Sequence, residues 1–272
     1  MQVGVFAKTF PGSEPAGVLA AVRDAGFAVT QFNLACAGLP SMPDAVPDEA
    51  IRAIVAAAKA AGVGLVALSG TYNMAHPDQA VRDDGMRRLA VIIETAAKLS
   101  TPLVTLCTGT RNAEDQWAHH PDNADPSAWA DMAREMEKAL QLAERHGVDL
   151  GIEPEQANIV TSADDAMRLI AEMGSKRLRI VLDPANLFER ADTKEARAIV
   201  AAAVERTAGH VSLAHAKDRF ADGRFATAGQ GVVDFADLIS RLKAAGFDGP
   251  LVTHGLSAEE APGVARFLKG LM

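Results

Sequence analysis

The stretch VDLGIEPEQANIVTSADDAMRLIAEMGSKRLRIVLD, residues 148–183, contains the repeating unit that decides the fold. It begins with one apolar run, Val148 to Glu153, and ends with another, Leu178 to Asp183. The segment between them carries apolar residues at helical spacing. Because the two runs are continuously apolar rather than alternating, they are typical of parallel strands that are buried on both faces. This stretch therefore predicts a strand, a helix and a second, parallel strand.

The same alternation extends along the whole chain. The predicted strands are Gln2–Ala7, Ala28–Leu34, Val63–Leu68, Pro102–Cys107, Val148–Glu153, Leu178–Asp183, His210–His215 and Pro250–His254. The segments between them have helical patterns, such as Ile51, Ile54 and Ala58, and Gly62 marks the end of that helix. Eight such units close naturally into a (β/α)8 TIM barrel of the α/β class. The alternative, a doubly wound open sheet, lacks the glycine-rich phosphate turn after the first strand.

The length of 272 residues is usual for one barrel of this type. No linker or low-complexity tract divides the chain, so we predict a single domain, residues 1–272. No apolar run approaches the roughly 18 residues of a membrane span, and the N-terminus has no basic leader. Cys36 and Cys107 lie in apolar stretches and are expected to be buried, reduced thiols. These features predict a cytoplasmic protein that does not bind membranes.

The charge balance is acidic, with 35 Asp and Glu residues against 27 Lys and Arg residues and a net charge of -8. Such a balance repels a phosphate backbone, and no Lys- or Arg-rich run interrupts it. Nucleic acid is therefore not an expected partner. The expected partner is a small molecule that binds at a local site.

Metal-capable side chains end four consecutive predicted strands. These residues are Glu153, Asp183, His215 and His254. The active site of a (β/α)8 barrel lies at the C-terminal ends of its strands, so we expect the four side chains to meet in the mouth. Two positions before each of them is a residue expected to face the barrel interior: Gly151, Val181, Leu213 and Val252. The alternative for any one of the four alone is a salt bridge at the rim or a buried hydrogen bond.

Two carboxylates and two imidazoles form a mixed set of oxygen and nitrogen donors. Such a set suits Mn²⁺, Co²⁺, Fe²⁺ or Zn²⁺ better than Mg²⁺ or Ca²⁺, which prefer shells made entirely of oxygen. We therefore predict one divalent metal ion per chain. Mn²⁺ is the first choice, and Mg²⁺ remains a less suited alternative.

Four motifs in a fixed order resemble those of a known family. They are Ile152-Glu153-Pro-Glu, Leu182-Asp183-Pro-Ala-Asn186, Ala214-His215-Ala-Lys217-Asp218 and Gly229-Gln-Gly231-Val-Val-Asp234-Phe. With these motifs, nearly the whole chain resembles the xylose isomerase-like barrels, which include sugar and sugar-phosphate isomerases and epimerases, inosose dehydratases and apurinic endonucleases. The resemblance implies that Glu153, Asp183 and His215 bind a divalent metal.

The fourth implied ligand departs from the family pattern, because His254 stands where the family usually has Glu. In the family's epimerases that Glu binds the metal and takes part in proton transfer. Histidine can do both, but its ordinary pKa is near 6.5 rather than near 4.3. A neutral imidazole also leaves the ion with one more uncompensated positive charge. Histidine at this position therefore still allows a metal site, but it leaves open which reaction the site catalyses.

The resemblance implies a sugar isomerase or epimerase that transfers a proton next to a carbonyl. In such chemistry the metal stabilises an ene-diolate, one group removes the α-proton and another returns it. We assign Glu153 as ligand and base, and His254 as ligand and second acid or base. Lys217 is expected to reach the developing oxyanion; its alternative is a surface lysine.

Other residues near the strand ends are candidates for binding sugar hydroxyls. The predicted substrate contacts are Tyr72, Asn73, Thr108, Arg111, Glu155 and Asn186. Asn186 stands where several family members have His. The longest connection, residues 114–129, holds Trp117, His119, His120 and Trp129 and is expected to cover the sugar as a lid; its alternative is a packed loop or an oligomer contact.

Three other functions compete with the isomerase or epimerase. A dehydratase acting on an inosose-like or keto-sugar substrate begins with the same proton abstraction and differs by expelling a β-hydroxyl, a step that a histidine acid at position 254 would suit. A barrel that binds a sugar without catalysis is suggested by the missing Glu, but Glu153, Asp183 and His215 argue against it. An apurinic endonuclease is disfavoured by Asn186 and by the acidic charge. A homo-oligomer is an expectation from the family alone.

Overall fold

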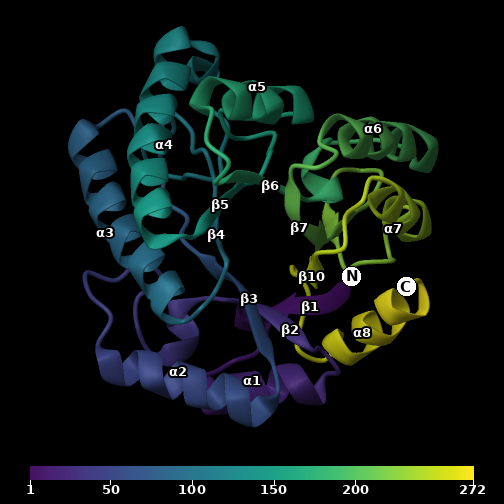
Figure 1. Ribbon diagram of the computed structural model, residues 1–272. Helices are drawn as coiled ribbons and strands as arrows, with labels where there is room; N and C mark the ends of the chain where they lie inside the picture. Colours follow the sequence, from purple (N-terminus) through teal and green to yellow (C-terminus); the bar gives the residue numbers. More distant parts are fainter.

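Eight parallel strands form a closed barrel in this computed structural model, which describes residues 1–272 (Figure 1). The strands are β1 (Gln2–Phe6), β2 (Val29–Phe32), β3 (Gly64–Ser69), β4 (Leu103–Leu106), β5 (Asp149–Ile152), β6 (Leu178–Leu182), β7 (Val211–Ala216) and β10 (Pro250–Thr253). Their order around the barrel is β1-β10-β7-β6-β5-β4-β3-β2, and β2 pairs with β1. The predicted (β/α)8 barrel is confirmed.

Eight helices surround the barrel. They are α1 (Pro15–Asp24), α2 (Asp48–Ala61), α3 (Gln79–Lys98), α4 (Pro126–His146), α5 (Ala163–Met173), α6 (Thr193–Arg206), α7 (Phe235–Ala244) and α8 (Ala261–Gly270). The predicted glycine stop at Gly62 is confirmed, because this residue ends α2 in the left-handed conformation with φ of 65°. None of the helices combines the length and the apolar character needed to cross a lipid bilayer.

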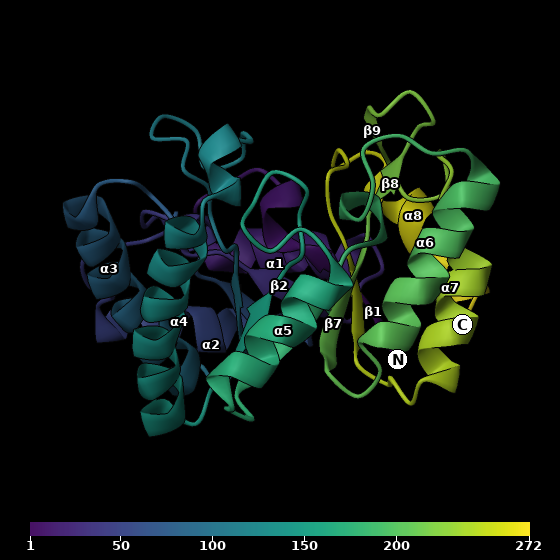
Figure 2. The ribbon, with the colours of Figure 1, turned by 90° about the horizontal axis from the view of Figure 1, so that it is seen from above.

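Short elements occupy the connections at the C-terminal ends of the strands. They are the 3-10 helices η1 (Ala7–Thr9), η2 (Leu34–Ala37), η3 (Pro121–Ala124) and η4 (Pro184–Asn186), and the hairpin of β8 (Asp218–Arg219) and β9 (Phe225–Ala226). Figure 2 shows the hairpin and η3 rising at the same end of the barrel, on opposite sides. The predicted strand 28–34 is too long, because the Asn33 side chain accepts a hydrogen bond from the Ala35 amide and starts η2. The hairpin is too short to produce an apolar run in the sequence.

The barrel interior has its own small apolar core, separate from the larger core between strands and helices. Its buried residues are Ala67, Leu103, Val181, Leu213 and Val252. Gly151 faces the same space, and a Cβ atom there would lie 2.8 Å from Val181 Cγ2. Three of the four residues predicted to face inward belong to this core, and Gly151 is the close neighbour of one of them. Side chains two positions further along therefore point into the mouth.

Candidate metal centre

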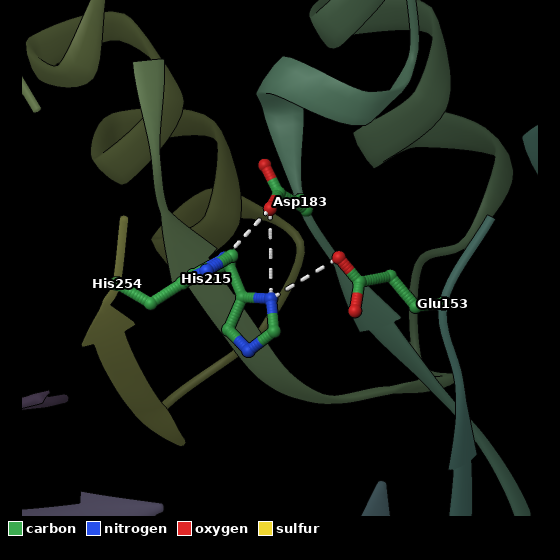
Figure 3. A group of neighbouring side chains, drawn as sticks. All are labelled: Glu153, Asp183, His215 and His254. Atoms are coloured by element: carbon green, nitrogen blue, oxygen red, sulfur yellow. Dashed lines mark hydrogen bonds and ion pairs between the residues drawn. The ribbon is translucent and has the colours of Figure 1, made fainter. Parts of the chain in front are cut away.

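Four side chains from four neighbouring strands converge above the interior core (Figure 3). Glu153, Asp183 and His254 directly follow β5, β6 and β10, and His215 lies in β7. Each offers one ligand atom, and all four atoms lie within 4.8 Å of one another. The barrel thus brings together the four residues that the strand ends suggested.

Hydrogen bonds and ion pairs link the four side chains. Nε2 of His254 lies 3.0 Å from Asp183 Oδ2. Nδ1 of His215 lies 3.3 Å from Glu153 Oε1 and 3.6 Å from Asp183 Oδ2 (Figure 3). The Asp183 side chain is fully buried, and Glu153 and His254 keep about a fifth of their surfaces exposed toward the mouth, at 19% and 22%. The cluster can therefore be reached from solvent on one side only.

The electrostatics of the cluster favour positive charge. Burial alone would raise the pKa of Asp183, but Lys217 and the hydrogen bonds from His215 and His254 outweigh it and hold this pKa well below its ordinary value. Burial alone would lower the pKa of His215, but the Glu153 charge and the bonds to Asp183 and Glu153 raise it to about 9. Burial and the His215 charge lower the pKa of His254. Without an ion, the proton on His215 supplies the positive charge.

The donor set and its compactness fit a divalent transition metal. Two carboxylate oxygens and two imidazole nitrogens match the preferences of Mn²⁺, Fe²⁺, Co²⁺ or Zn²⁺. Bonds of roughly 2.0–2.2 Å keep the ligands of one ion at most about 4.4 Å apart. Since the four donor atoms already lie within 4.8 Å of one another, a small inward movement of the side chains would close the shell.

Gln31 is a member of the site that sequence reasoning missed. It lies in β2, and its Nε2 donates to Ser69 Oγ and Thr105 Oγ1, both at 3.2 Å. Its Oε1 therefore faces His215 Nε2 at 3.0 Å and accepts a hydrogen from it, so that Nδ1 is the nitrogen that points into the cluster. When Nδ1 gives up its proton, its lone pair is available to an ion. The available signal was an amide in the middle of the apolar run 28–34, ahead of the Asn33 that ends the strand.

A hydrogen-bonded chain connects Lys217 with Glu153. Lys217 Nζ donates to Asn186 Oδ1 at 3.0 Å, and Asn186 Nδ2 donates to Glu153 Oε1 at 2.7 Å. Glu153 Oε2 makes no hydrogen bond, although it belongs to the same carboxylate. Asn186 thus fixes the orientation of Glu153 and leaves one carboxylate oxygen free to act.

A cavity of about 990 Å³ opens over the cluster. Of the predicted site residues, those that line it are Glu153, His215, His254, Lys217, Glu155 and Asn186. Burial, and secondarily the charge of Glu153, raises the pKa of Glu155 to about 7. Trp117 of the predicted lid also lines the cavity and is half exposed. His120 instead accepts a hydrogen bond from the Asp122 amide at the start of η3, and Trp129 packs under Arg168.

The structure does not bring the other four predicted substrate contacts to the cavity. The Tyr72 hydroxyl donates to Glu135 of α4 at 3.0 Å, and Arg111 forms an ion pair with Asp131 at 2.7 Å. Asn73 Oδ1 accepts from the Thr110 amide at 2.8 Å, and Thr108 Oγ1 accepts from the Val160 amide at 3.1 Å. Tyr72 and Arg111 thus tie the loops after β3 and β4 to α4. Asn73 and Thr108 satisfy buried backbone amides of the loops after β4 and β5, which must find hydrogen-bond partners.

Asp218 organises the loop that carries the motif Gly229-Gln-Gly231-Val-Val. It is fully buried, and its carboxylate accepts hydrogen bonds from the backbone amides of Arg219, Gly229, Gly231 and Val233. A Cβ atom on Gly231 would lie 2.2 Å from the Arg219 carbonyl oxygen and 2.4 Å from Asp218 Oδ1. The glycine is therefore required for the loop to approach Asp218.

Gly231→Ala is expected to lower the free energy of unfolding by about 1–3 kcal/mol, because the loop must move to admit the methyl group. Gly263→Ala is the matched control, since it lies in α8 and a Cβ atom there meets no atom within 4 Å. That change should be neutral or stabilise by up to about 1 kcal/mol. Urea denaturation followed by circular dichroism measures both; equal stability of the two variants would contradict the loop packing described.

Comparisons with known proteins agree with this architecture. A family model described as xylose isomerase-like TIM barrel matches residues 19–270. Among solved structures, 3-keto-D-glucoside 4-epimerase from E. coli is similar over 99% of both chains, with 18% identity and a TM-score of 0.78. An L-ribulose 3-epimerase is 20% identical over 99% of this chain and 92% of its own, with a TM-score of 0.76.

A third similar structure is D-psicose 3-epimerase from Clostridium cellulolyticum H10, which is 14% identical over 100% of this chain and 99% of its own, with a TM-score of 0.76. No curated protein matches the sequence.

Proposed function

The chain belongs to the xylose isomerase-like TIM barrel family, and we propose that it is a divalent-metal-dependent sugar isomerase or epimerase. The observation that carries the proposal is the convergence of Glu153, Asp183, His215 and His254 under one cavity. That several solved structures of the same fold are sugar epimerases supports the reaction class. We further propose that residues 1–272 act as one domain.

Glu153 is the proposed base that removes the proton beside the substrate carbonyl. Its Oε2 is free of hydrogen bonds, while Oε1 is held by Asn186 at 2.7 Å. This arrangement keeps the carboxylate oriented and leaves one oxygen able to accept a proton. Lys217 donates to Asn186 with one of its three ammonium hydrogens, so that others remain for the negative oxygen that develops on the substrate.

His254 is the proposed second acid or base. It lines the cavity from the end of β10, whereas Glu153 lines it from the end of β5, and β7 and β6 lie between these two strands. Proton return from a different direction is what inversion at a carbon requires. The lowered pKa of His254 favours donation of a proton once the ring is protonated. Because a neutral imidazole has one basic lone pair, His254 accepts a proton only while that lone pair is not bound to the ion.

Glu153, Asp183, His215 and His254 are the residues that would hold the ion, and Mn²⁺ is the ion that we favour. When bound, such an ion polarises the substrate carbonyl and stabilises negative charge on its oxygen. The protein's own contribution is to fix the ligands. Gln31 orients His215, and the Ala185 amide donates to Asp183 Oδ1 at 2.9 Å.

The test is proton exchange with solvent. Incubation of the Mn²⁺-loaded protein with a panel of ketoses and keto-inositols in D₂O should place deuterium on the carbon next to the carbonyl of one or more of them, detected by proton NMR. A product that has lost a molecule of water would instead identify a dehydratase. Absence of exchange with every sugar in the panel, despite bound metal, would contradict the proposed function.

A further inference from the structure

A connected group of three basic residues lies beside the metal-capable cluster; Lys217, Arg219 and Arg190 are called the cationic wall below. Lys217 Nζ lies 3.6 Å from the centroid of the Phe225 ring, and the Arg219 guanidinium carbon lies 4.1 Å from it. At the tip of the hairpin, Arg219 donates to the Gly223 carbonyl, and the Arg190 side chain packs beside Gly223. All three residues line the cavity.

None of the three residues has a carboxylate partner. Lys217 is only 9% exposed, yet its one hydrogen bond goes to the amide oxygen of Asn186. Arg219 donates to the carbonyl oxygens of Ala185, Glu189 and Gly223, and Arg190 makes neither a hydrogen bond nor an ion pair. A lysine buried to this degree is rare without a counter-charge. Although the charge of Lys217 lowers the pKa of Asp183, no carboxylate contacts any of the three basic groups, so they can still bind an anion in the cavity.

The net charge of the side chains that line the cavity has the opposite sign to the net charge of the whole chain. The lining contains five basic side chains, which are Lys8, Arg190, Lys217, Arg219 and Arg224, and apart from Glu153 it contains three acidic ones, which are Glu155, Glu189 and Asp222. A divalent ion would balance the charges of Glu153 and Asp183. The remaining lining is then net positive, although the chain has a net charge of -8. A cavity of one sign concentrates ligands of the other sign.

We propose that the cationic wall binds an anionic substituent, a phosphate or a carboxylate, on the sugar substrate. The inference rests on the proposed function and narrows its substrate class. Lys217 is hydrogen bonded through Asn186 to Glu153, whereas Arg190 is exposed at the outer end of the wall. A sugar whose reacting carbon lies near Glu153 therefore directs its far end toward Arg219 and Arg190. Phosphate and carboxylate oxygens are the acceptors that guanidinium groups bind best.

The first experiment compares binding of three sugars with one carbon skeleton. D-fructose, D-fructose 6-phosphate and D-fructuronate are titrated by calorimetry into the Mn²⁺-loaded wild-type protein at two salt concentrations, with inorganic phosphate as a fourth probe. At least one anionic sugar should bind tenfold or more tightly than D-fructose, with an advantage that shrinks at high salt. Whichever of D-fructose 6-phosphate and D-fructuronate binds more tightly shows whether the cationic wall recognises a phosphate or a carboxylate. Equal affinities, or no binding by any anionic probe, would overturn the inference.

The second experiment removes one charge from the wall. Arg190→Gln deletes a charge without deleting a hydrogen bond, so it should weaken the anionic sugar about tenfold and leave D-fructose unchanged. Arg52→Gln makes the same change on an exposed, unpaired residue of α2 and should alter neither affinity. Arg219→Gln, which also removes three backbone contacts, should weaken the anionic sugar further. If Arg190→Gln and Arg219→Gln weaken neutral and anionic sugars equally, the inference is wrong.

The two proposals fail separately. Calorimetry needs no turnover, so selective anion binding without deuterium exchange would remove the proposed function and keep the wall as a binding site. Exchange on neutral sugars, with no preference for anionic ones, would remove only the wall.

Discussion

Glu153→Gln is expected to lower the rate of deuterium exchange by about 10²–10⁴-fold, the range that a positioned general base contributes. The amide has nearly the same size as the carboxylate, but it carries no charge and does not accept a proton at neutral pH. The side chain is 19% exposed and lies in the mouth, so the fold should tolerate the change. The measurement is exchange on the sugar that the wild-type protein turns over.

Glu189→Gln is the matched control for this variant. It makes the same change on an exposed side chain of the same cavity, and exchange should remain close to that of the wild-type protein. Circular dichroism and metal content are measured on both variants. Loss of exchange with metal still bound assigns Glu153 as the base, whereas full retention of exchange would remove it from that role.

Asp183→Asn is expected to weaken Mn²⁺ binding by on the order of 10²-fold or more, since even residues that only support metal ligands affect affinity 10–100-fold. Asp183 is fully buried and contacts both imidazoles of the cluster. The asparagine keeps an oxygen for the Ala185 amide but removes the charge. The wild-type protein should bind one ion per chain, measured by elemental analysis and by competition with a chelator.

Asp222→Asn is the control for metal binding, because its carboxylate is in the same cavity and pairs only with Arg224. The affinity of the Asp222→Asn variant for Mn²⁺ should match that of the wild-type protein.

The affinity of the wild-type protein for Mn²⁺ should also depend on pH. Since the pKa of His215 is about 9 without metal, the ion displaces a proton at pH 7, and its affinity should rise by up to about tenfold per pH unit until about pH 9. A wild-type protein that takes up no metal would contradict the site.

The barrel could be predicted because its evidence is local in the sequence. Buried parallel strands are continuously apolar, and a residue's place at the end of such a run determines which end of the barrel it occupies. Glu153, Asp183, His215 and His254 were all placed in this way. The prediction of the inward layer below them succeeded for the same reason, since side chains alternate along a strand with a period of two.

The side-chain directions of Tyr72 and Gln31 could not be predicted from the residues next to them in the sequence. Tyr72 lies in a loop at the functional end of the barrel, but its hydroxyl turns outward to Glu135, which is 63 residues away in the sequence. Gln31 lies within an apolar run, and its partner His215 is 184 residues away. The direction of each side chain depends on which distant groups fold against it, and no short pattern records that.

The sequence by itself determined the (β/α)8 barrel and the strand ends that carry Glu153, Asp183, His215 and His254, because periodicity and strand termini are properties of neighbouring residues. Only the tertiary structure decided that Asn186 and Gln31 orient these side chains, and that Tyr72, Asn73, Thr108 and Arg111 make their contacts outside the cavity. It also decided that Lys217, Arg219 and Arg190 gather around the hairpin without ion-pair partners. These outcomes depend on hydrogen bonds and charge contacts between distant segments, which exist only once the barrel has closed.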